Sequence, residues 1–372
     1  MKIAYIVEGN PEDNRLWSGT VTAIYNALKK EHDVLPVDIT YKSKLLSGYY
    51  RVKTKLTKLL TDKKFYSVFA KQKAIEQSKL VDKFLRSNKD IDLVFCPAKS
   101  GSIAYVKTDK KVVYLTDATF NLMVGYYDYL TNLSKSTLKS GNEIEFRAIS
   151  RSNTVICASE WAKNSVVKDY AKDVSRVKVI PFGANLVDVY KDKETLLPKT
   201  LNLLFCGVEW ERKGGDIALE TLKSLRDSGF NAKLYLVGCK PPYDIKDENI
   251  IQVGFLNKNN PEELKKLFKI YSQVQFLILP TKAEAAGIVF AEASMNGIIS
   301  LTYDTGGVGS YVVDGVNGYK LPLKNTGKDF ANAVIEIFSD EQKFIYLKKS
   351  SRKYYEDRLN YQAWLKDFNK IL

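Results

Sequence analysis

The feature that most constrains the fold is a regular alternation of short apolar runs with longer amphipathic segments. Runs such as "KIAYIVEG" at residues 2–9 and "IDLVFCPA" at residues 91–98 have the pattern of buried strands, and stretches with helical periodicity separate such runs. Strands that alternate with helices build parallel sheets whose two faces are covered by helices. The sequence therefore predicts an α/β protein with doubly wound sheets.

This alternation starts afresh in the middle of the chain. A polar stretch at residues 186–200 is followed by a new buried strand that begins at Leu201 and opens a second series of strands and helices. A chain of 372 residues is also long for a single hydrophobic core. We therefore predict two Rossmann-like domains, residues 1–190 and residues 200–354, that face each other across a cleft.

The last segment of the chain has the pattern of an amphipathic helix. Its apolar residues recur at i, i+3, i+4 and i+7. They are Tyr361, Trp364, Leu365 and Phe368. We expect a helix over about residues 355–372 that packs back on the first domain and so across both.

The inventory of reactive side chains excludes several chemistries. The four cysteines lie in strand-like runs without a CxxC pair, which indicates small core residues in a reducing cytoplasm. They are Cys96, Cys157, Cys206 and Cys239. The only histidine is His32, between a helix-like and a strand-like segment, so a Ser-His-Asp triad or a histidine metal site is excluded. We expect no metal and no cofactor. No apolar run reaches the roughly 18 residues that a membrane-spanning helix needs.

The net charge of +14 favours anionic partners such as nucleotide phosphates or an acidic membrane. Much of the excess lies in residues 41–73, within a long helical stretch that extends to about Asn88, where leucines and lysines partly separate onto two faces. The leucines are Leu56, Leu59 and Leu60, and the lysines are Lys53, Lys55 and Lys58. Such a helix can lie on the inner membrane surface, and an ordinary solvated helix is the alternative. Nucleic acid is not expected, because the tyrosines are scattered rather than gathered along a basic groove.

Ligands of open α/β sheets bind beyond the carboxyl ends of the strands, so the residues that follow strands are the candidates. The strand that begins at Leu201 leads into "WERKGG", in which Arg212 and Lys213 precede a glycine pair and a helix start. Backbone amides and a helix dipole at such a turn bind anions, and two cations suit a diphosphate. A merely solvated helix end is the alternative. No P-loop motif and no clean GxGxxG is present.

The stretch "PTKAEAAGIVFAEASMNG" at residues 280–297 places two carboxylates in an apolar environment. Glu284 lies in the loop after a buried strand, and Glu292 lies within a helix that should start near Gly287 and end at the Asn-Gly pair. The amides of Gly287, Ile288 and Val289 are predicted to be unpaired donors for phosphate oxygens. The carboxylates would then accept hydrogen bonds from sugar and ribose hydroxyls.

The E-x7-E spacing of this stretch resembles the signature of the retaining glycosyltransferases of the GT-B fold, family 4. Other segments are also similar to that family, so the resemblance covers most of the chain and is densest from about residue 150 to 325. These segments are "LWSGT" at 16–20, "ASEWAKNSVV" at 158–167, "VIPFGAN" at 179–185, "WERKGG" and "TGGVGSYVVDGVNGYKLP" at 305–322. The combination is more specific than any single motif.

The resemblance implies an activity and a set of site residues. It implies retaining, metal-independent transfer of a sugar from a UDP- or GDP-sugar to a glycan, lipid-linked or protein acceptor, in polysaccharide or glycoconjugate synthesis. Glu284 would bond hydroxyls of the transferred sugar, Glu292 would hold the ribose, and Arg212 and Lys213 would neutralise the diphosphate. Gly19 would allow close approach of the backbone to the phosphate or the acceptor. The further donor-binding residues are Gly207, Gly254 and Phe255.

Two positions depart from the family pattern. Many relatives have Gly-Arg where this chain has Gly207-Val208, so we expect Arg212 to supply the missing cation. Many relatives also carry a histidine near the donor sugar, where this chain has Asp117. That carboxylate either accepts a bond from a sugar hydroxyl or caps the next helix. A route that needs a histidine there is excluded, and no covalent nucleophile is identified.

Two alternative functions share this fold. A sugar-nucleotide 2-epimerase would want acid–base groups in the cleft, and the absence of cleft histidines weighs against it. A non-catalytic subunit would have no need of the two glutamates and the two adjacent cations. The sugar, the base and the acceptor site are not determined by the sequence.

Overall fold

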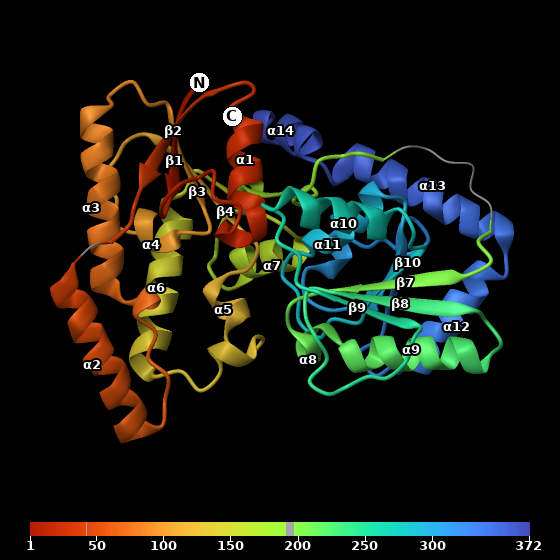
Figure 1. Cartoon of the computed structure of the whole chain (residues 1–372). Coiled ribbons are helices and arrows are strands. Elements are labelled where there is room, and N and C mark those ends of the chain that lie inside the picture. Colours follow the sequence, from red (N-terminus) through yellow and green to blue (C-terminus); the bar gives the residue numbers. More distant parts are fainter. Residues whose placement is uncertain (42, 191–196) are drawn as a thin grey trace. The chain divides into compact units, whose positions relative to one another are not determined.

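The computed structural model describes residues 1–41, 43–190 and 197–372 (Figure 1). The chain divides into two compact units: unit 1 is Met1–Ile180 with Asp367–Leu372, and unit 2 is Pro181–Lys366. Each unit contains one six-stranded sheet in which all neighbouring strands are parallel. The predicted α/β class with two doubly wound sheets is confirmed. The chain enters unit 2 at Pro181, and part of the predicted linker, residues 191–196, lies outside the described residues.

The sheet of unit 1 has the strand order β2-β1-β3-β4-β5-β6. Its strands are β1 Lys2–Val7, β2 Asp33–Asp38, β3 Leu93–Pro97, β4 Lys111–Thr116, β5 Thr154–Cys157 and β6 Val177–Val179. The order reverses between β1 and β3, which makes that pair the switch point of this sheet. Every residue of β3 and β5 is buried, because helices cover both faces, and this explains the continuous apolar runs of the sequence.

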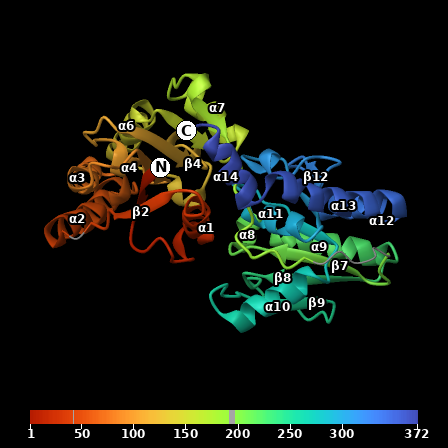
Figure 2. The ribbon, with the colours of Figure 1, turned by 90° about the horizontal axis from the view of Figure 1, so that it is seen from above.

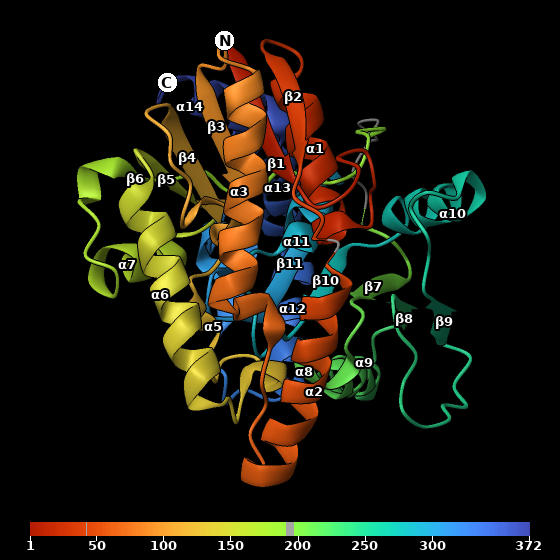
Figure 3. The ribbon, with the colours of Figure 1, turned by 90° about the vertical axis from the view of Figure 1, so that its left-hand side faces the viewer.

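Two helices, α3 (Lys71–Ser87) and α6 (Lys135–Arg151), lie on one face of this sheet, as Figure 3 shows. On the other face, Tyr5 of β1 donates a hydrogen bond to the backbone of helix α1 (Thr20–Leu28). The remaining helices of unit 1 are α2 Lys44–Thr61, α4 Ser100–Ile103, α5 Phe120–Met123 and α7 Glu160–Lys168, with 3-10 turns η1 Leu16–Gly19, η2 Ser67–Phe69, η3 Asp128–Leu130 and η4 Val174–Arg176. These elements place the loops that follow β1, β3 and β4 at one edge of the sheet.

The long helical stretch that was predicted to extend to about Asn88 is not one helix. Helix α2 ends at Thr61, because Asp62 adopts a left-handed conformation with φ 54°. Phe65 then turns inward and packs with Tyr50 and Ala70 in a small cluster, and α3 begins only at Lys71. The periodicity of the sequence did not reveal this break, because leucines and lysines continue at helical spacing up to it.

The sheet of unit 2 has the order β12-β11-β10-β7-β8-β9, which reverses between β7 and β10. Its strands are β7 Leu201–Cys206, β8 Ala232–Val237, β9 Ile250–Gly254, β10 Phe276–Leu279, β11 Ile299–Tyr303 and β12 Gly318–Leu321. Its helices are α8 Trp210–Lys213, α9 Gly215–Asp227, α10 Pro261–Tyr271, α11 Ile288–Met295, α12 Gly327–Phe338 and α13 Glu341–Arg358, with the turn η5 Val308–Ser310. The loops after β7 and β10 therefore lie at the switch point of unit 2, where doubly wound sheets bind ligands.

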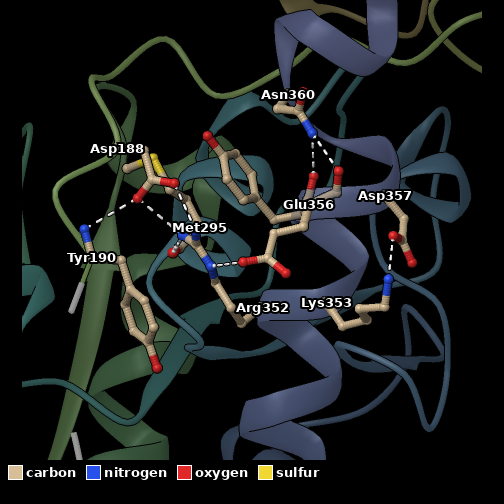
Figure 4. A network of polar contacts seen from close by, with 9 residues as sticks. Asp188, Tyr190, Met295, Arg352, Lys353, Glu356, Asp357 and Asn360 are labelled. Atoms are coloured by element: carbon tan, nitrogen blue, oxygen red, sulfur yellow. Dashed lines mark hydrogen bonds and ion pairs between the residues drawn. The ribbon is translucent and has the colours of Figure 1, made fainter. Parts of the chain in front are cut away.

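Arg352 of α13 holds the first residues of unit 2 in place (Figure 4). Its guanidinium binds both carboxylate oxygens of Asp188, at 2.9 and 2.7 Å, and donates to the carbonyl of Met295 at 2.6 Å. The guanidinium also lies over the ring of Tyr190, 4.7 Å from its centroid. A bidentate Arg–carboxylate pair with a stacked ring fixes orientation as well as distance. The segment after the crossover into unit 2 is thus tied to the helices of that unit.

The C-terminal segment consists of two helices instead of the single one that was predicted. Helix α13 ends at Arg358, and Asn360 accepts hydrogen bonds from the amides of Gln362 and Ala363 as the start of α14, Tyr361–Asn369. Residues from Asp367 onward belong to unit 1. There the ring of Phe368 packs edge-on against Phe95 of β3, with ring centroids 5.5 Å apart. Within the described ranges, no helix combines the length and apolar character that crossing a membrane requires.

Candidate functional site

Three loops of unit 2 interlock at the carboxyl edge of its sheet. They follow β7, β10 and β11, which are neighbours in the sheet. The amide of Lys282 donates to the carbonyl of Arg212 at 2.8 Å, and the amide of Gly307 donates to the carbonyl of Glu284 at 2.8 Å. The motifs that the sequence analysis singled out at residues 210–215, 280–297 and 305–322 therefore meet in one cluster, which we call the unit 2 loop cluster.

The central contact of this cluster is an ion pair between the ammonium of Lys213 and the carboxylate of Glu284. Both residues are only 8% exposed. Removing two charges from water costs several kcal/mol per ion, and the attraction of the pair offsets that cost only in good geometry. Two of the predicted site residues, separated by 71 positions in the chain, are thus brought into direct contact.

Arg212 lies on the same short helix and is held on two sides. Its Nη1 donates to the carbonyl of Ala283 at 2.7 Å, and its Nε binds the carboxylate of Glu209. The guanidinium therefore sits against the loop that carries Glu284. That Arg212 supplies the cation that Val208 lacks stays a prediction.

The glycines of "WERKGG" also have packing roles. Gly214 has a φ of 77°, and a Cβ there would collide with the carbonyl of Pro280. A Cβ on Gly215 would collide with the ring of Trp210, and one on Gly207 would come within 2.8 Å of Lys213 Cγ. Gly214 thus lets the loops after β7 and β10 approach each other, and Gly207 and Gly215 let the loop after β7 fold closely on itself. Close packing alone explains these glycines, whether or not a phosphate binds.

Helix α11 starts and ends as predicted, between Gly287 and Asn296. The expectation of unpaired donors at its start is wrong for Ile288, whose amide donates to the carbonyl of Ala286 at 3.1 Å. The loop turns tightly before the helix, so a local carbonyl reaches that amide. Gly287 has another constraint, since a Cβ there would collide with the ring of Phe290.

Glu292 lies in the second turn of α11 and is 3% exposed. Its carboxylate forms an ion pair with Lys258 and accepts a hydrogen bond from the hydroxyl of Tyr271 at 3.0 Å. The side chain of Lys258 is 35% exposed, so the ammonium covers a carboxylate that is otherwise enclosed. A hydroxyl ligand would reach Glu292 by displacing this lysine head group.

Gly254 and Phe255 lie apart from the Lys213–Glu284 pair. Gly254 is the last residue of the edge strand β9, and Phe255 follows it. In the sheet, β8 lies between β9 and β7. Gly254 has a φ of 76°, and its carbonyl accepts from the amide of Gly238 at 2.9 Å. The ring of Phe255 is 68% exposed. The described contacts do not join these two residues to the unit 2 loop cluster.

The predicted residues of unit 1 form a second group. Gly19 has a φ of 88°, and the preceding Trp17 and Ser18 are also left-handed, so the loop after β1 is a strained turn that requires glycine at that position. The indole of Trp17 donates to the carboxylate of Asp117 at 3.3 Å. The structure thus joins the loop after β1 to the residue that follows β4, and this pairing was not predicted.

The sequence analysis missed three further charged residues that form ion pairs near the carboxyl edges of the two sheets. Glu8 follows β1 and binds Lys99, which follows β3, with 2.9 Å between the charged atoms at the switch point of unit 1. The rule that candidates follow strands would have selected both. Lys258 was missed because nothing local relates it to Glu292, which lies 34 positions further along the chain.

The remaining sequence inferences concern cysteine, histidine and metals. All four cysteines are free, with Cys96 and Cys157 buried and Cys206 and Cys239 partly exposed. His32 binds Asn369 through Nε2 at 2.9 Å, which ties it to the C-terminal segment of unit 1. In the part of the chain that the structure describes, no group of three or more His, Cys, Asp or Glu residues is arranged to hold a metal ion.

Comparison with known proteins yields one family model, described as "Glycosyl transferases group 1", which matches residues 188–354. An uncharacterized glycosyltransferase of Methanocaldococcus jannaschii is 26% identical over 200 residues, which is 52% of this chain and 52% of that protein. The lipopolysaccharide glucosyltransferase WaaG of Escherichia coli is 27% identical over 200 residues, 49% of each. The chain spans about half the length of the curated relatives it matches.

Solved structures resemble the chain over its whole length. The crystal structure of WaaG, a glycosyltransferase involved in lipopolysaccharide biosynthesis, has a TM-score of 0.61 at 17% identity and covers 99% of both chains. Anabaena HepE in complex with UDP has a TM-score of 0.65 at 14% identity and covers 100% of this chain and 99% of its own. The fold is therefore that of the GT-B glycosyltransferases.

Proposed function

We propose that this chain is a retaining glycosyltransferase that moves a sugar from a nucleotide diphosphate donor to an acceptor without a metal ion. The observation that carries the proposal is the buried pair of Lys213 and Glu284 in the unit 2 loop cluster. The family match supports it, because residues 188–354 include both residues of the pair. Uracil is the base we favour, since HepE was solved with UDP and with UDP-glucose.

Charge is the basis of the proposed mechanism. Breaking the anomeric C–O bond leaves an oxocarbenium-like sugar and a diphosphate with developing negative charge. Lys213, Arg212 and the N-terminal end of α11 would stabilise that charge, and electrostatic stabilisation of this kind usually contributes more to catalysis than any other effect. Losing one cation should raise the barrier by about 3 kcal/mol, roughly a hundredfold in rate.

Hydroxyl recognition would fall to the two glutamates. Glu284 would accept bonds from the donor sugar while it orients Lys213. Glu292 would accept the ribose hydroxyls after Lys258 has moved aside, and Tyr271 would keep the carboxylate aligned. From unit 1, the strained turn at Gly19 and the carboxylate of Asp117 would contribute to donor or acceptor binding. The acceptor would be a glycan, a lipid-linked sugar or a protein, and the reaction would take place in the cytoplasm.

A thermal-shift panel tests the donor site. UDP, GDP, ADP and their sugars are compared on the wild type, on Glu292→Gln and on Glu262→Gln, an exposed control in the first turn of α10. A nucleotide at a hundred times its dissociation constant should add about 2.7 kcal/mol to the wild type and the control. The shift should shrink in Glu292→Gln, measured against its own ligand-free protein. No shift with any nucleotide would reject the donor site and favour a non-catalytic subunit.

The stereochemical and metal parts of the proposal need a separate measurement. With the preferred donor, proton NMR of the first product should show the donor's anomeric configuration, and a chelator should not change the rate. An inverted anomer or a loss of rate restored by a divalent cation would contradict those parts and leave nucleotide binding unaffected.

A further inference from the structure

Helix α2 carries an uncovered apolar face. Six of its side chains are large, apolar and exposed, among eighteen such side chains over all described residues. They are Leu45, Tyr49, Val52, Leu56, Leu59 and Leu60. Leu45 is 89% exposed, Leu59 80% and Leu60 76%. Monomeric soluble proteins seldom leave apolar side chains gathered in this way without a partner.

These six residues follow one another at steps of four, three, four, three and one. At 3.6 residues per turn, such steps place them on a single stripe along the helix. Lys53 and Lys55 flank this stripe, one on each side, and three further basic residues of α2 lie beyond Lys55 toward the opposite side of the helix. They are Lys44, Arg51 and Lys58. No acidic residue occurs in Lys44–Thr61.

The rest of unit 1 fixes which side of α2 faces outward. Tyr50 is buried in the cluster with Phe65 and Ala70, and Leu46 packs against that cluster from the same side of the helix. The C-terminal end of α2 is tied down by the side chain of Asn132, which donates to the carbonyl of Asp62 at 2.7 Å. The apolar stripe therefore cannot turn inward without breaking this packing. Figures 1 and 2 show α2 at the outer edge of unit 1.

We propose that this apolar stripe of α2 inserts into the surface of an anionic membrane while the basic residues of the same helix bind lipid phosphates. A helix of this composition lies in the plane of the interface, with its apolar side among the acyl chains and its cations at head-group level. A second copy of the chain is a poor occupant, because two such helices would bring ten cations together against only the two Asp62 carboxylates, each already paired with Lys58. The inference does not depend on the proposed sugar transfer.

Vesicle flotation of the full chain tests this proposal. The wild type should bind vesicles of phosphatidylcholine with phosphatidylglycerol at least tenfold more strongly than vesicles of phosphatidylcholine alone. Leu56→Gln/Leu59→Gln/Leu60→Gln should lose at least tenfold of that binding, and so should Arg51→Gln/Lys55→Gln/Lys58→Gln. No binding by the wild type, or undiminished binding by the leucine variant, would overturn the proposal.

Matched controls separate the helix from bulk charge and hydrophobicity. Lys265→Gln/Lys266→Gln/Lys269→Gln removes the same charge from α10, and Val174→Gln/Leu323→Gln/Tyr346→Gln removes exposed apolar side chains that are scattered over three segments. Both controls should bind vesicles like the wild type, and all variants should keep the wild-type melting temperature because the altered residues are exposed. Equal loss of binding in the controls would contradict a role for α2.

Two further measurements complete the test: the fluorescence of a tryptophan placed on α2, and the oligomeric state of the chain in solution. The wild type contains four tryptophans, so the emission that Leu59→Trp adds is obtained as the difference from the wild type. That difference should shift to the blue with anionic vesicles and not with vesicles of phosphatidylcholine alone. Light scattering without vesicles should give one chain per particle at all concentrations. A dimer that the leucine variant abolishes would overturn the membrane assignment and identify a second copy as the occupant.

Discussion

At the residue scale, the candidate site depends on charged groups that have lost most of their water. Lys213 and Glu284 are buried together, and Glu292 is enclosed by Lys258 and Tyr271. Glu145 in unit 1 is buried as well and has a tyrosine partner instead of a cation. A buried charge with a partner tolerates removal of both charges better than removal of one. Comparing the removal of one charge with the removal of both therefore distinguishes a pair that only supports the fold from a pair that takes part in the reaction.

Replacing Lys213 with methionine keeps the aliphatic stem and leaves the Glu284 carboxylate buried without its cation. We expect the free energy of unfolding to fall by about 3 kcal/mol and sugar transfer to fall about a hundredfold. Lys213→Met/Glu284→Gln removes both charges and should return to within about 1 kcal/mol of the wild type while remaining inactive. Denaturant titration and a transfer assay measure the two effects.

An exposed pair provides the control. Lys353→Met breaks the surface pair with Asp357 and should change stability by less than about 0.5 kcal/mol. Wild-type transfer rates in the double variant would show that the buried pair only supports the fold.

The second prediction concerns pH and Glu145. Burial raises the pKa of this carboxyl to about 7, although the hydroxyl of Tyr114 donates to it at 3.0 Å. Between pH 4.5 and pH 7 the folded chain then holds a proton that the unfolded chain has lost. The free energy of unfolding should therefore fall as pH rises through this window, by at most about 3 kcal/mol, and level off above it.

The measurement is denaturant unfolding of the wild type and Glu145→Gln from about pH 5 to about pH 8, a range that spans the raised pKa. The variant has no titrating group at position 145, so the wild type should lose stability relative to the variant as the pH rises. A constant difference between the two proteins across this range would contradict the raised pKa.

At the element scale, the unit 2 loop cluster depends on Gly214, which permits close contact between two of its loops. Gly214 ends α8 and precedes α9, with its left-handed backbone against Pro280 of the next loop. Short helices such as α8 have little stability of their own, so tertiary contacts determine where they form. The position of Arg212 and Lys213 therefore depends on contacts with the loop after β10.

Gly214→Ala and Gly229→Ala form a matched pair for this argument. Both glycines are left-handed, with φ of 77° and 86°, but a Cβ at Gly229 meets nothing within 4 Å. The change at Gly229 should cost about 1 kcal/mol from backbone strain. The change at Gly214 should cost about 3 kcal/mol or more, because the loops must also separate. Thermal unfolding compares them, and equal costs would refute the close contact.

At the scale of the whole molecule, the chain passes from unit 1 to unit 2 and returns for its last residues. Phe368 is fully buried and packs on Phe95, and Asn369 binds both His32 and Glu31. The ammonium of Lys111 donates to the carbonyl of Leu372 at 2.7 Å. Residues 367–372 therefore complete unit 1, although they are most distant from it in sequence.

Phe368→Ala tests this return. Loss of a buried phenylalanine should lower the free energy of unfolding by about 3 to 5 kcal/mol, and the β1–β3 region of unit 1 should be the part that loosens. Hydrogen exchange at residues 2–7 and 93–97 should rise. Lys370→Ala removes only an exposed pair with Asp367 and should leave both measurements unchanged. Unaltered exchange in Phe368→Ala would show that the C-terminal residues do not complete this core.

The sequence by itself determined the α/β class, the second series of strands from Leu201, and the bounds of α11. Local periodicity and Gly or Asn signals carry that information, because they report which face of a segment is buried and where it ends. The tertiary structure decided that Lys213 meets Glu284, that Lys258 covers Glu292, and that the stretch before Asn88 breaks at Asp62. Those outcomes depend on strand order and on contacts between residues far apart in the chain, which no local pattern encodes.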